Sequence, residues 1–205
     1  MSTEAILTAV AAAREAIHAH EADIEGLDRA IGDGDHYINI KRGVDTILAM
    51  EGELSAMAPS AALKAIAMKL MSTIGGASGP LISSFFLAGA KTEGIDEPWT
   101  PATVARLVAD GVAAIQKRGK ADVGDKTMLD VLIPVADVLA EGAGEGLGAG
   151  DLKTRAVATA QKGMEATRDI TARFGRAAFL GERAIGHVDP GAMSSFVIIR
   201  AICKD

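Results

Sequence analysis

The sequence is poor in several features, and each shortage excludes a class of protein. Its formal net charge is −6 and it has no block of Lys and Arg, so nonspecific binding to nucleic acid is not expected. It has no window of the roughly 18 uncharged apolar residues that a membrane span needs. The single cysteine, Cys203, cannot form an internal disulfide, and the N-terminus lacks the pattern of a signal peptide. We therefore expect a cytoplasmic protein in a reducing compartment.

Aromatic residues make up only 3% of the chain, although hydrophobic residues make up 49%. A core of Ala, Leu, Ile, Val and Met is typical of close-packed helices, because small side chains let helix axes approach one another. The length of 205 residues suits one domain with a substantial core, and neither a linker nor an internal repeat divides it. We predict an all-α fold and a single domain over residues 1–205.

Eight segments repeat apolar residues at steps of three and four, which is the spacing of an amphipathic helix. They are residues 6–24, 36–50, 59–74, 78–87, 101–119, 127–140, 151–164 and 190–202. Thr100, Asp151 and Asp189 are the expected N-caps, whereas Gly26 and Gly119 are expected to end the helices before them. Eight helices without a convincing strand predict an up-and-down eight-helix barrel or bundle.

Three stretches leave a local choice open. Pro134 removes one hydrogen bond from its helix, which either bends there or is held straight by packing. The glycine-rich run 142–150 lacks the Lys-Ser/Thr ending of a phosphate loop and is predicted to be a flexible connector. The β-branched run 196–202 fits a buried strand as well as a helix, but a lone strand would have no partner. We therefore predict a helix there.

Three aspartates fall within eight residues, between the first two predicted helices. Asp28, Asp33 and Asp35 stand beside Gly32 and Gly34, which let the backbone turn tightly enough for the carboxylates to face one point. Mg²⁺ prefers oxygen ligands and usually lies between a few carboxylates and a substrate phosphate. Asp and Gly are also ordinary turn residues, so a solvated turn is the alternative to a metal site.

Three further helix junctions carry glycine or charged clusters: residues 75–80, 117–128 and 173–192. The first is a small-residue turn at a helix start, where unpaired backbone N–H groups favour an anion. The third is long for an idle connection, although surface ion pairs are the alternative for each of its cations. In an up-and-down barrel, the turns after the first, third, fifth and seventh helices meet at one end. We therefore predict a nucleotide site at one rim.

These blocks resemble the nucleotide-binding L subunit of dihydroxyacetone kinases, and the likeness spans nearly the full chain. The motifs GDGDH, GGASGP, RGKA…GDKTM and GERAIGH.DPGA occur in the family's order, at residues 32–36, 75–80, 118–128 and 181–192. The resemblance implies an eight-helix barrel that holds ADP or ATP through Mg²⁺ at one end. It also implies a separate K subunit, which binds dihydroxyacetone covalently on its own histidine.

The resemblance assigns roles to individual residues. It implies that Asp28, Asp33 and Asp35 bind Mg²⁺, with two ions bridging the nucleotide phosphates. The nucleotide-binding residues that it implies are His36, Tyr37, Ile38, Asn39, Ala77, Ser78, Gly119, Met128, Arg176, Asp189, Pro190 and Gly191. Among these, Gly119 and Met128 would border the adenine, and Arg176 would close over the nucleotide with the 189–191 turn. His36 and Arg176 would assist phosphoryl transfer. No residue is assigned as a nucleophile, because metal ions and backbone amides neutralise the charge of the phosphoryl group while it is transferred.

Two departures from the family pattern leave alternatives open. Position 37 is Tyr where the family usually has Gly, so we expect its ring near the phosphates or the docked partner, and a related ketose such as erythrulose becomes a candidate substrate. A free-standing L subunit resembles the phosphotransferase-system type, in which a phosphohistidine carrier protein rephosphorylates bound ADP. The alternatives are an ATP-dependent kinase subunit, a nucleotide-binding module that reports to a transcription regulator, and a helical binding domain with a degenerate site.

Overall fold

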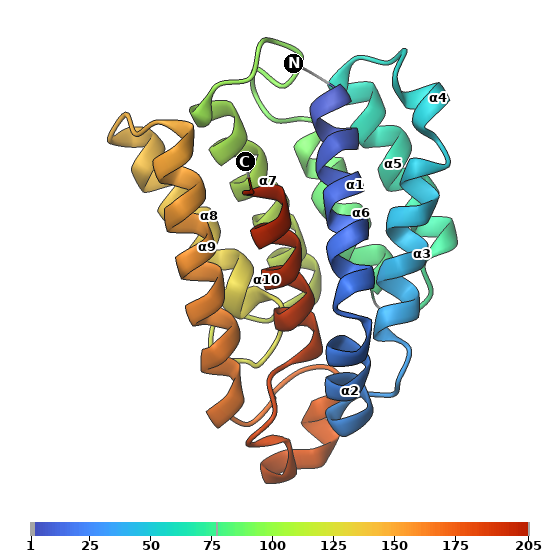
Figure 1. Ribbon diagram of the computed structural model, residues 1–205, viewed down its shortest axis with the longest axis vertical. Helices are drawn as coiled ribbons and strands as arrows, with labels where there is room; N and C mark the ends of the chain where they lie inside the picture. The colour runs from blue at the N-terminus through green and yellow to red at the C-terminus, as the bar shows by residue number, and fades with distance from the viewer. Residues whose placement is uncertain (1–2, 77, 205) are drawn as a thin grey trace.

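The computed structural model describes residues 3–76 and 78–204, and no strand occurs within those ranges (Figure 1). Longer connections occur at residues 90–100 and 120–128, and two 3₁₀ segments occur before the last helix. The elements are α1 (Thr3–Ala19), α2 (Glu21–Ile31), α3 (His36–Leu48), α4 (Glu51–Leu54), α5 (Pro59–Thr73), α6 (Ser78–Gly89), α7 (Pro101–Gly119), α8 (Leu129–Gly144), α9 (Ala149–Ala166), η1 (Thr167–Asp169), η2 (Arg176–Ala184) and α10 (Pro190–Ile202).

Eight of these helices close into a ring. Each packs against the next in the order α1, α3, α5, α6, α7, α8, α9 and α10, and α10 returns to α1. Figure 1 shows the first and last helices side by side, with α2 below them at the lower end. The predicted all-α eight-helix barrel is confirmed. In the part of the chain that the structure describes, no helix is long and apolar enough to cross a membrane.

The first predicted helix is in fact two helices. The chain breaks at His20, where α1 ends and α2 begins, and the predicted stop at Gly26 lies inside α2. The prediction was wrong because Gly26 keeps the backbone of the helix and lacks the positive φ of a glycine that ends one. The break lets the amphipathic stripe continue from Ile17 to Ile24, both fully buried, while the chain changes direction. α2 is thereby placed at one end of the barrel.

The other helix boundaries give a mixed result. Thr100 accepts a hydrogen bond from the Thr103 amide, and Asp189 accepts one from the Ala192 amide, so both predicted caps are confirmed. Asp151 is not a cap, because α9 already starts after Gly148 and places Asp151 in its first turn. The glycine-rich run is mostly helical rather than a connector: α8 continues to Gly144, and only residues 145–148 form the turn. Small residues allow this, since Leu152 and Leu147 fill the space beside Gly142.

The two remaining stretches are both helical, which confirms the helix predicted for residues 196–202. Pro134 lies inside an uninterrupted α8, and residues 196–202 form the end of α10.

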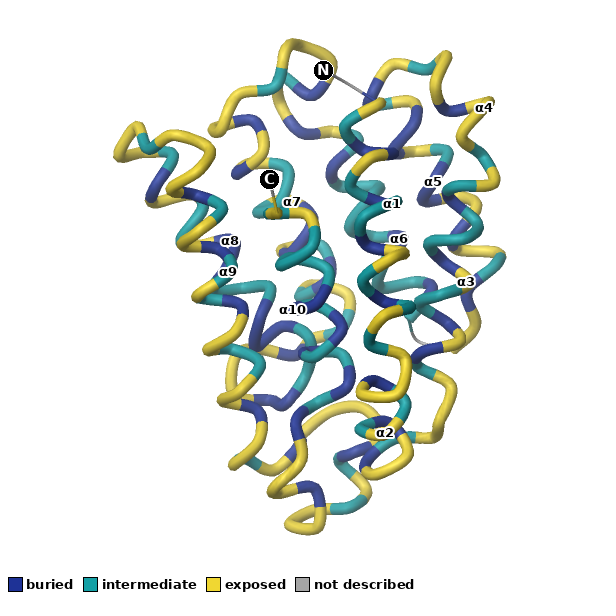
Figure 2. Tube along the Cα trace, viewed as in Figure 1, coloured by how far each residue is buried: buried dark blue, intermediate teal, exposed yellow. Residues whose placement is uncertain are grey.

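Burial follows the inner faces of the ring, as the dark segments in Figure 2 show. The largest apolar cluster joins α1, α3, α5 and neighbouring residues and includes Leu54, Ile66 and Leu70. Helices approach closely where glycine permits it, for a β-carbon on Gly163 of α9 would lie 2.3 Å from the Asp130 carbonyl of α8.

Candidate functional site

The three aspartates of the loop between α2 and α3 face one point. One carboxylate oxygen from each of Asp28, Asp33 and Asp35 lies within 4.8 Å of the others. Asp28 is buried on the last turns of α2, whereas Asp33 and Asp35 are exposed in the loop. Three hard oxygen donors at this separation fit Mg²⁺, which is bound by few carboxylates and keeps positions for phosphate or water. The predicted ligands are therefore brought together.

Local contacts hold Asp28 in position. Its Oδ2 accepts a hydrogen bond of 2.9 Å from the amide of His36, which spans the turn between the helices. Its Oδ1 lies 1.8 Å from the place that a β-carbon on Gly32 would occupy. Only glycine fits there, because any side chain would displace the carboxylate. Gly34 has φ +79°, a left-handed conformation that favours glycine.

The loop between α2 and α3, with Asp28 at the end of α2, is called the acidic loop below. His36 connects it to the start of α10. Its Nε2 lies 2.9 Å from Ser194 Oγ, and the Ser194 hydroxyl also donates to the Gly191 carbonyl at 3.1 Å. Burial lowers the pKa of His36, although the nearby Asp28 and Asp35 carboxylates oppose the shift. Sequence reasoning missed Ser194. The signal was its position three residues after Gly191, one helical turn along the same face.

The long segment between α9 and α10 reaches the acidic loop. Arg176 Nε lies 2.7 Å from Asp33 Oδ2, and both side chains are exposed. The segment is fixed below by apolar contacts, since Ala177 and Ala184 pack with Ile31 at the end of α2. In Figure 1 this orange-red segment lies beside α2 at the lower end. The structure thus places the loop of Arg176 beside the aspartates, at the same end of the barrel; the role of Arg176 over a nucleotide stays a prediction.

The 120–128 turn joins the same group of loops. The Arg173 amide donates to the Asp125 carbonyl at 3.1 Å, and the Arg173 guanidinium lies 3.4 Å from the Asp125 carboxylate. A β-carbon on Gly191 would lie 3.4 Å from the backbone and β-carbon of Met128. Met128 and the start of α10 therefore lie next to each other, although they are far apart in the sequence.

Asp189 is half-buried at the N-terminus of α10. Its Oδ2 accepts a hydrogen bond of 2.8 Å from the Ala192 amide. Burial raises the pKa of Asp189 to about 7, and the Asp130 carboxylate adds to the shift, while Lys126 and the amides of Ala192 and Gly191 oppose it. Asp189 is therefore a capping and orienting group beneath Pro190 and Gly191.

The remaining predicted residues lie on the walls around these loops. Asn39 Oδ1 lies 3.8 Å from the place of a β-carbon on Gly75, which connects α3 to the turn before α6. Ser78 begins α6, and a β-carbon on Gly119 would lie 3.2 Å from Leu81 of the same helix. The prediction for Ala77 lies outside the described residues. The junctions α2–α3, α5–α6, α7–α8 and α9–α10 thus border one end of the barrel.

Tyr37 and Ile38 point in different directions. The Tyr37 ring is buried, at 4% exposure, in a cluster with Ile17 and Ile24, and its hydroxyl donates to Glu21 Oε2 at 2.9 Å. The prediction that this ring lies near the phosphates or a docked partner is wrong, because the first turn of α3 directs it into the core. Burial raises the pKa of Tyr37 to about 12, and the bond to Glu21 acts in the same direction. Ile38, by contrast, is exposed beside the acidic loop.

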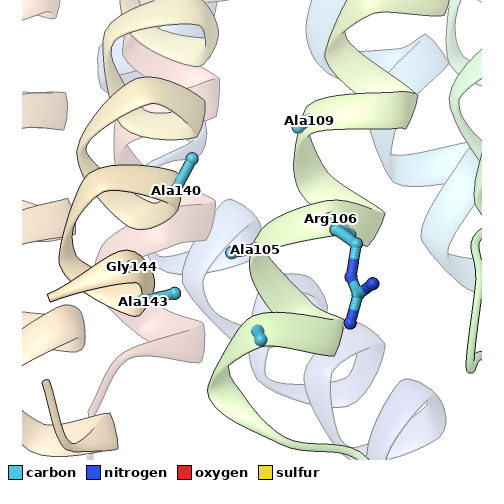
Figure 3. A pocket seen from close by; sticks show the side chains of 7 residues that line it. Ala105, Arg106, Ala109, Ala140, Ala143 and Gly144 are labelled. Carbon is cyan, nitrogen blue, oxygen red and sulfur yellow. The ribbon is translucent and has the colours of Figure 1, made fainter. Parts of the chain in front are cut away.

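Two concave regions lie away from this end and offer no comparable chemistry. A cavity of about 230 Å³ between α7 and α8 is lined almost entirely by small side chains (Figure 3). Its one charged residue, Arg106, pairs with Glu93 at 3.2 Å. An open groove of about 460 Å³ lies between α9 and α10, and there Arg200 is already engaged by His20 at 2.7 Å. The acidic loop and its neighbours are therefore the candidate site.

Comparison with known proteins identifies the class to which this fold and site belong. The model of the DAK2 domain family matches residues 30–204, and the chain belongs to that family. The match begins just after Asp28 and includes Asp33, Asp35 and the whole of the long segment before α10. The resemblance drawn from the four sequence motifs is confirmed.

Particular relatives are similar over most of their length. The ADP-binding subunit DhaL of the PEP-dependent dihydroxyacetone kinase of Escherichia coli strain K12 is 36% identical over 179 residues, covering 87% of this chain and 85% of that protein. The ADP-binding subunit DhaL of the PTS-dependent dihydroxyacetone kinase of Lactococcus lactis is 39% identical over 199 residues, covering 93% and 91%.

A solved structure shares the fold. The dihydroxyacetone kinase of C. freundii in complex with AMP-PNP and Mg²⁺ superposes with a TM-score of 0.71 at 25% identity. The superposition covers 96% of this chain but 33% of that one, so this chain spans about a third of the length of that kinase. The helical barrel described here therefore also occurs as one part of a longer protein.

Proposed function

We propose that this chain is the ADP- and Mg²⁺-binding subunit of a dihydroxyacetone-type kinase. The single observation that carries the proposal is the meeting of three aspartates with Arg176 and the capped start of α10 at one end of the barrel. The similarity to the DhaL subunits supports it. The substrate class is a short ketose, dihydroxyacetone or a similar sugar, held covalently on a histidine of a separate K subunit.

The acidic loop gives the chain its part in metal binding. Asp28, Asp33 and Asp35 would hold Mg²⁺, in our proposal two ions, which neutralise the phosphates and stabilise charge during phosphoryl transfer. Asp28 is preset by the His36 amide and by the space that Gly32 leaves open. Because these contacts are made within the chain, the ligand geometry is preorganised.

The residues around the loop position the nucleotide. Arg176 supplies a cation on the opposite side of the site, and exposure leaves its guanidinium able to turn from Asp33 to a phosphate oxygen. His36 is held by Ser194 and, with its lowered pKa, serves as a neutral hydrogen-bonding group. The Met128–Gly191 contact would form the border of the base, together with Gly119. Ser78 and the first amides of α6 provide donors for phosphate.

The phosphoryl donor is the finer part of the proposal. The L subunits that the chain resembles are named as PEP- or PTS-dependent, so we propose that ADP stays bound and is rephosphorylated in place by a phosphohistidine carrier protein. Direct use of ATP is the second candidate, favoured by the AMP-PNP that the C. freundii kinase holds. The two donors are distinguished by an assay of the purified chain with its K subunit and a ketose. The rate of phosphoryl transfer from ATP is compared with the rate from a phosphorylated carrier protein. Turnover with ATP alone at the full rate would contradict the carrier-dependent form.

Binding itself is tested with Asp33→Ala. Asp33 is exposed, so the barrel should keep its helix content while the affinity for Mg²⁺-ADP falls by about 100-fold. Titration calorimetry measures the affinity and circular dichroism the helix content. Asp137→Ala is the matched control, because Asp137 is an exposed aspartate on α8 away from the acidic loop. Unchanged affinity in Asp33→Ala would show that the metal assignment is wrong.

A further inference from the structure

Lys126 is a buried cation that none of the roles above uses. Its side chain is 1% exposed and is among the largest fully buried side chains of the described residues. Its Nζ donates to the carbonyl of Thr167 at 2.5 Å and to the carbonyl of His187 at 2.6 Å. A buried ammonium is costly unless its protons are bonded, so these two bonds define where the side chain must lie.

The surroundings of Lys126 are strongly charged. Asp189, Asp169 and Asp130 face it and favour the ammonium, whereas burial lowers the pKa of the amine and Arg168 acts in the same direction. Asp130 also fixes the backbone on both sides of Lys126, because its carboxylate accepts from the Gly124 amide at 2.6 Å and the Thr127 amide at 2.7 Å. The lysine is therefore anchored at its backbone as well as at its tip.

The backbone of Lys126 has φ 60°, a left-handed conformation that side chains other than Gly, Asn and Asp rarely adopt. Such a conformation persists only where the surrounding structure holds it, and it is found frequently at functional sites. Here it directs the side chain out of the 120–128 turn and between the two ends of the 167–189 segment. The turn and the segment lie 41 and 61 residues apart in sequence at these contacts.

Other bonds cross the same interface. The Arg173 amide donates to the Asp125 carbonyl at 3.1 Å, and the Arg173 guanidinium lies 3.4 Å from the Asp125 carboxylate. Within the segment, the Asp189 amide donates to Thr167 Oγ1 at 3.0 Å and joins its two ends. Lys126 is the member that touches both ends of the segment, at Thr167 and at His187. Close to these contacts in the sequence stand Met128 on one side and Gly191 on the other, and a β-carbon on Gly191 would lie 3.4 Å from Met128.

We propose that Lys126 is a positioning residue that joins the 120–128 turn to the 167–189 segment and so fixes the Met128–Gly191 edge of the nucleotide site. The inference rests on the proposed function, because it assigns the residue a role in nucleotide affinity without contact to the nucleotide. Asp28, Asp33 and Asp35 lie on α2 and the loop after it, which make no hydrogen bond to Lys126 among the described residues. The 167–189 segment does meet this loop at the Arg176–Asp33 ion pair, but that pair is exposed, and Asp28 is held by the His36 amide rather than by the segment. Removal of Lys126 therefore weakens nucleotide binding and leaves the metal ligands in place.

Lys126→Met tests the role, since methionine keeps most of the length and loses the charge and the donors. We expect the affinity for Mg²⁺-ADP to fall about tenfold or more, measured by calorimetry at a temperature where the variant is fully folded. The affinity for Mn²⁺ alone, read from the free-ion signal in electron paramagnetic resonance, should change less than about twofold. A purely structural role would lower the melting temperature without this split between nucleotide and metal.

Two control variants separate the bonds from other effects. Lys120→Met removes a lysine with the same φ of 60° from the start of the same turn, but Lys120 is exposed, so its loss should not change nucleotide affinity. Lys126→Gly relieves the left-handed backbone and removes the bonds, and it should be as impaired as Lys126→Met. Wild-type affinity in folded Lys126→Met, or in Lys126→Gly, overturns the inference.

Amide hydrogen exchange of the wild-type protein gives a test that needs no variant. If Lys126 joins the two segments, amides of 120–128 and 167–189 open together, with one common free energy, and ADP protects both. Independent opening of the two segments overturns the inference even if Lys126→Met fails to fold. If the wild-type protein binds no Mg²⁺-ADP, the proposed function is wrong, and so is the role of Lys126 in nucleotide affinity. If the wild-type protein binds Mg²⁺-ADP and Lys126→Met binds it equally well, only the inference about Lys126 is wrong.

Discussion

Two regions of the barrel are held together by different forces: the wall, made by the packed helices, and the site end, made by the loops around the three aspartates. In the wall, the largest cluster buries Leu54, Ile66 and Leu70 almost completely against apolar neighbours. At the site end, Asp33 and Asp35 are exposed, and Phe179 on η2 is 83% exposed. The loops there are fixed by hydrogen bonds and charges, such as those of Lys126 and Asp130.

The difference shows how one chain separates stability from binding. Apolar burial is nondirectional and sums over many contacts, so the wall can supply most of the folding free energy. Hydrogen bonds and ion pairs contribute less net stability but fix direction, which a phosphate and metal site requires. Variants in the wall should therefore change mainly stability, and variants in the loops that carry the metal ligands should change mainly affinity.

The largest expected effect is in the wall. Ile66→Ala removes a fully buried side chain from the centre of α5 and should lower the free energy of unfolding by about 2–5 kcal/mol. Urea unfolding followed by circular dichroism measures this loss. The affinity of the folded variant for Mg²⁺-ADP should stay within twofold of the wild type. A large loss of affinity in the folded variant would erase the distinction between the two regions.

At the site end, the main effect expected of Gly32→Ala is on affinity. The new β-carbon would lie 1.8 Å from Asp28 Oδ1, so the carboxylate must move, and the affinity for Mg²⁺-ADP should fall about tenfold. The backbone at Gly32 has φ −119°, outside the left-handed region, but the β-carbon would also lie 2.8 Å from the Asp28 carbonyl, so stability should fall as well, and affinity is compared in the folded variant. Gly26→Ala in α2 is the matched control, because nothing lies within 4 Å of its β-carbon. Equal affinities in the two variants would contradict the assigned position of Asp28.

A smaller effect is expected in the pH dependence of stability. The pKa of Asp189 is raised by burial from 3.8 to about 7, so between these values the unfolded state is ionised while the folded state retains the proton. The contribution of this group is fully present below about pH 4 and is lost as pH rises to 7. Lys126 opposes the shift and Asp130 adds to it, as the two charged side chains that influence Asp189 most.

Asp189→Asn should remove that pH dependence while the side-chain oxygen still caps α10. The melting temperature of the wild type minus that of Asp189→Asn should therefore decrease by a few degrees from pH 4 to pH 7 and stay constant above. Differential scanning calorimetry gives both values. A difference that increases with pH would show that attraction to Lys126 outweighs burial.

The smallest effect is expected where the two regions meet. Tyr37→Phe keeps the buried ring and removes the bond to Glu21, so the free energy of unfolding should fall by about 1 kcal/mol. Because the ring faces the core rather than the acidic loop, the affinity for Mg²⁺-ADP should be nearly unchanged. Calorimetry on both proteins checks this, and a tenfold loss of affinity would restore a direct role for Tyr37 at the nucleotide.

Much of the fold could be predicted from local patterns. Apolar spacing located all eight helices of the ring, and Thr100 and Asp189 marked two helix starts correctly, because periodicity and capping depend on neighbouring residues. The predictions based on glycine were wrong at Gly26 and in the 142–150 run, because in the sequence a glycine inside a helix looks the same as one that ends it. The direction of Tyr37 was equally invisible, because it depends on how α3 leaves the turn.

The sequence by itself determined the helical class, the acidic loop and the family, because each is written in residues close together along the chain. Only the tertiary structure decided that His36 meets Ser194, that Arg176 reaches Asp33 and that Lys126 bonds the carbonyls of Thr167 and His187. Those contacts join residues between 41 and 158 positions apart. Such partners are selected by the closure of the helical ring, which brings distant junctions to one end and leaves no trace in local spacing.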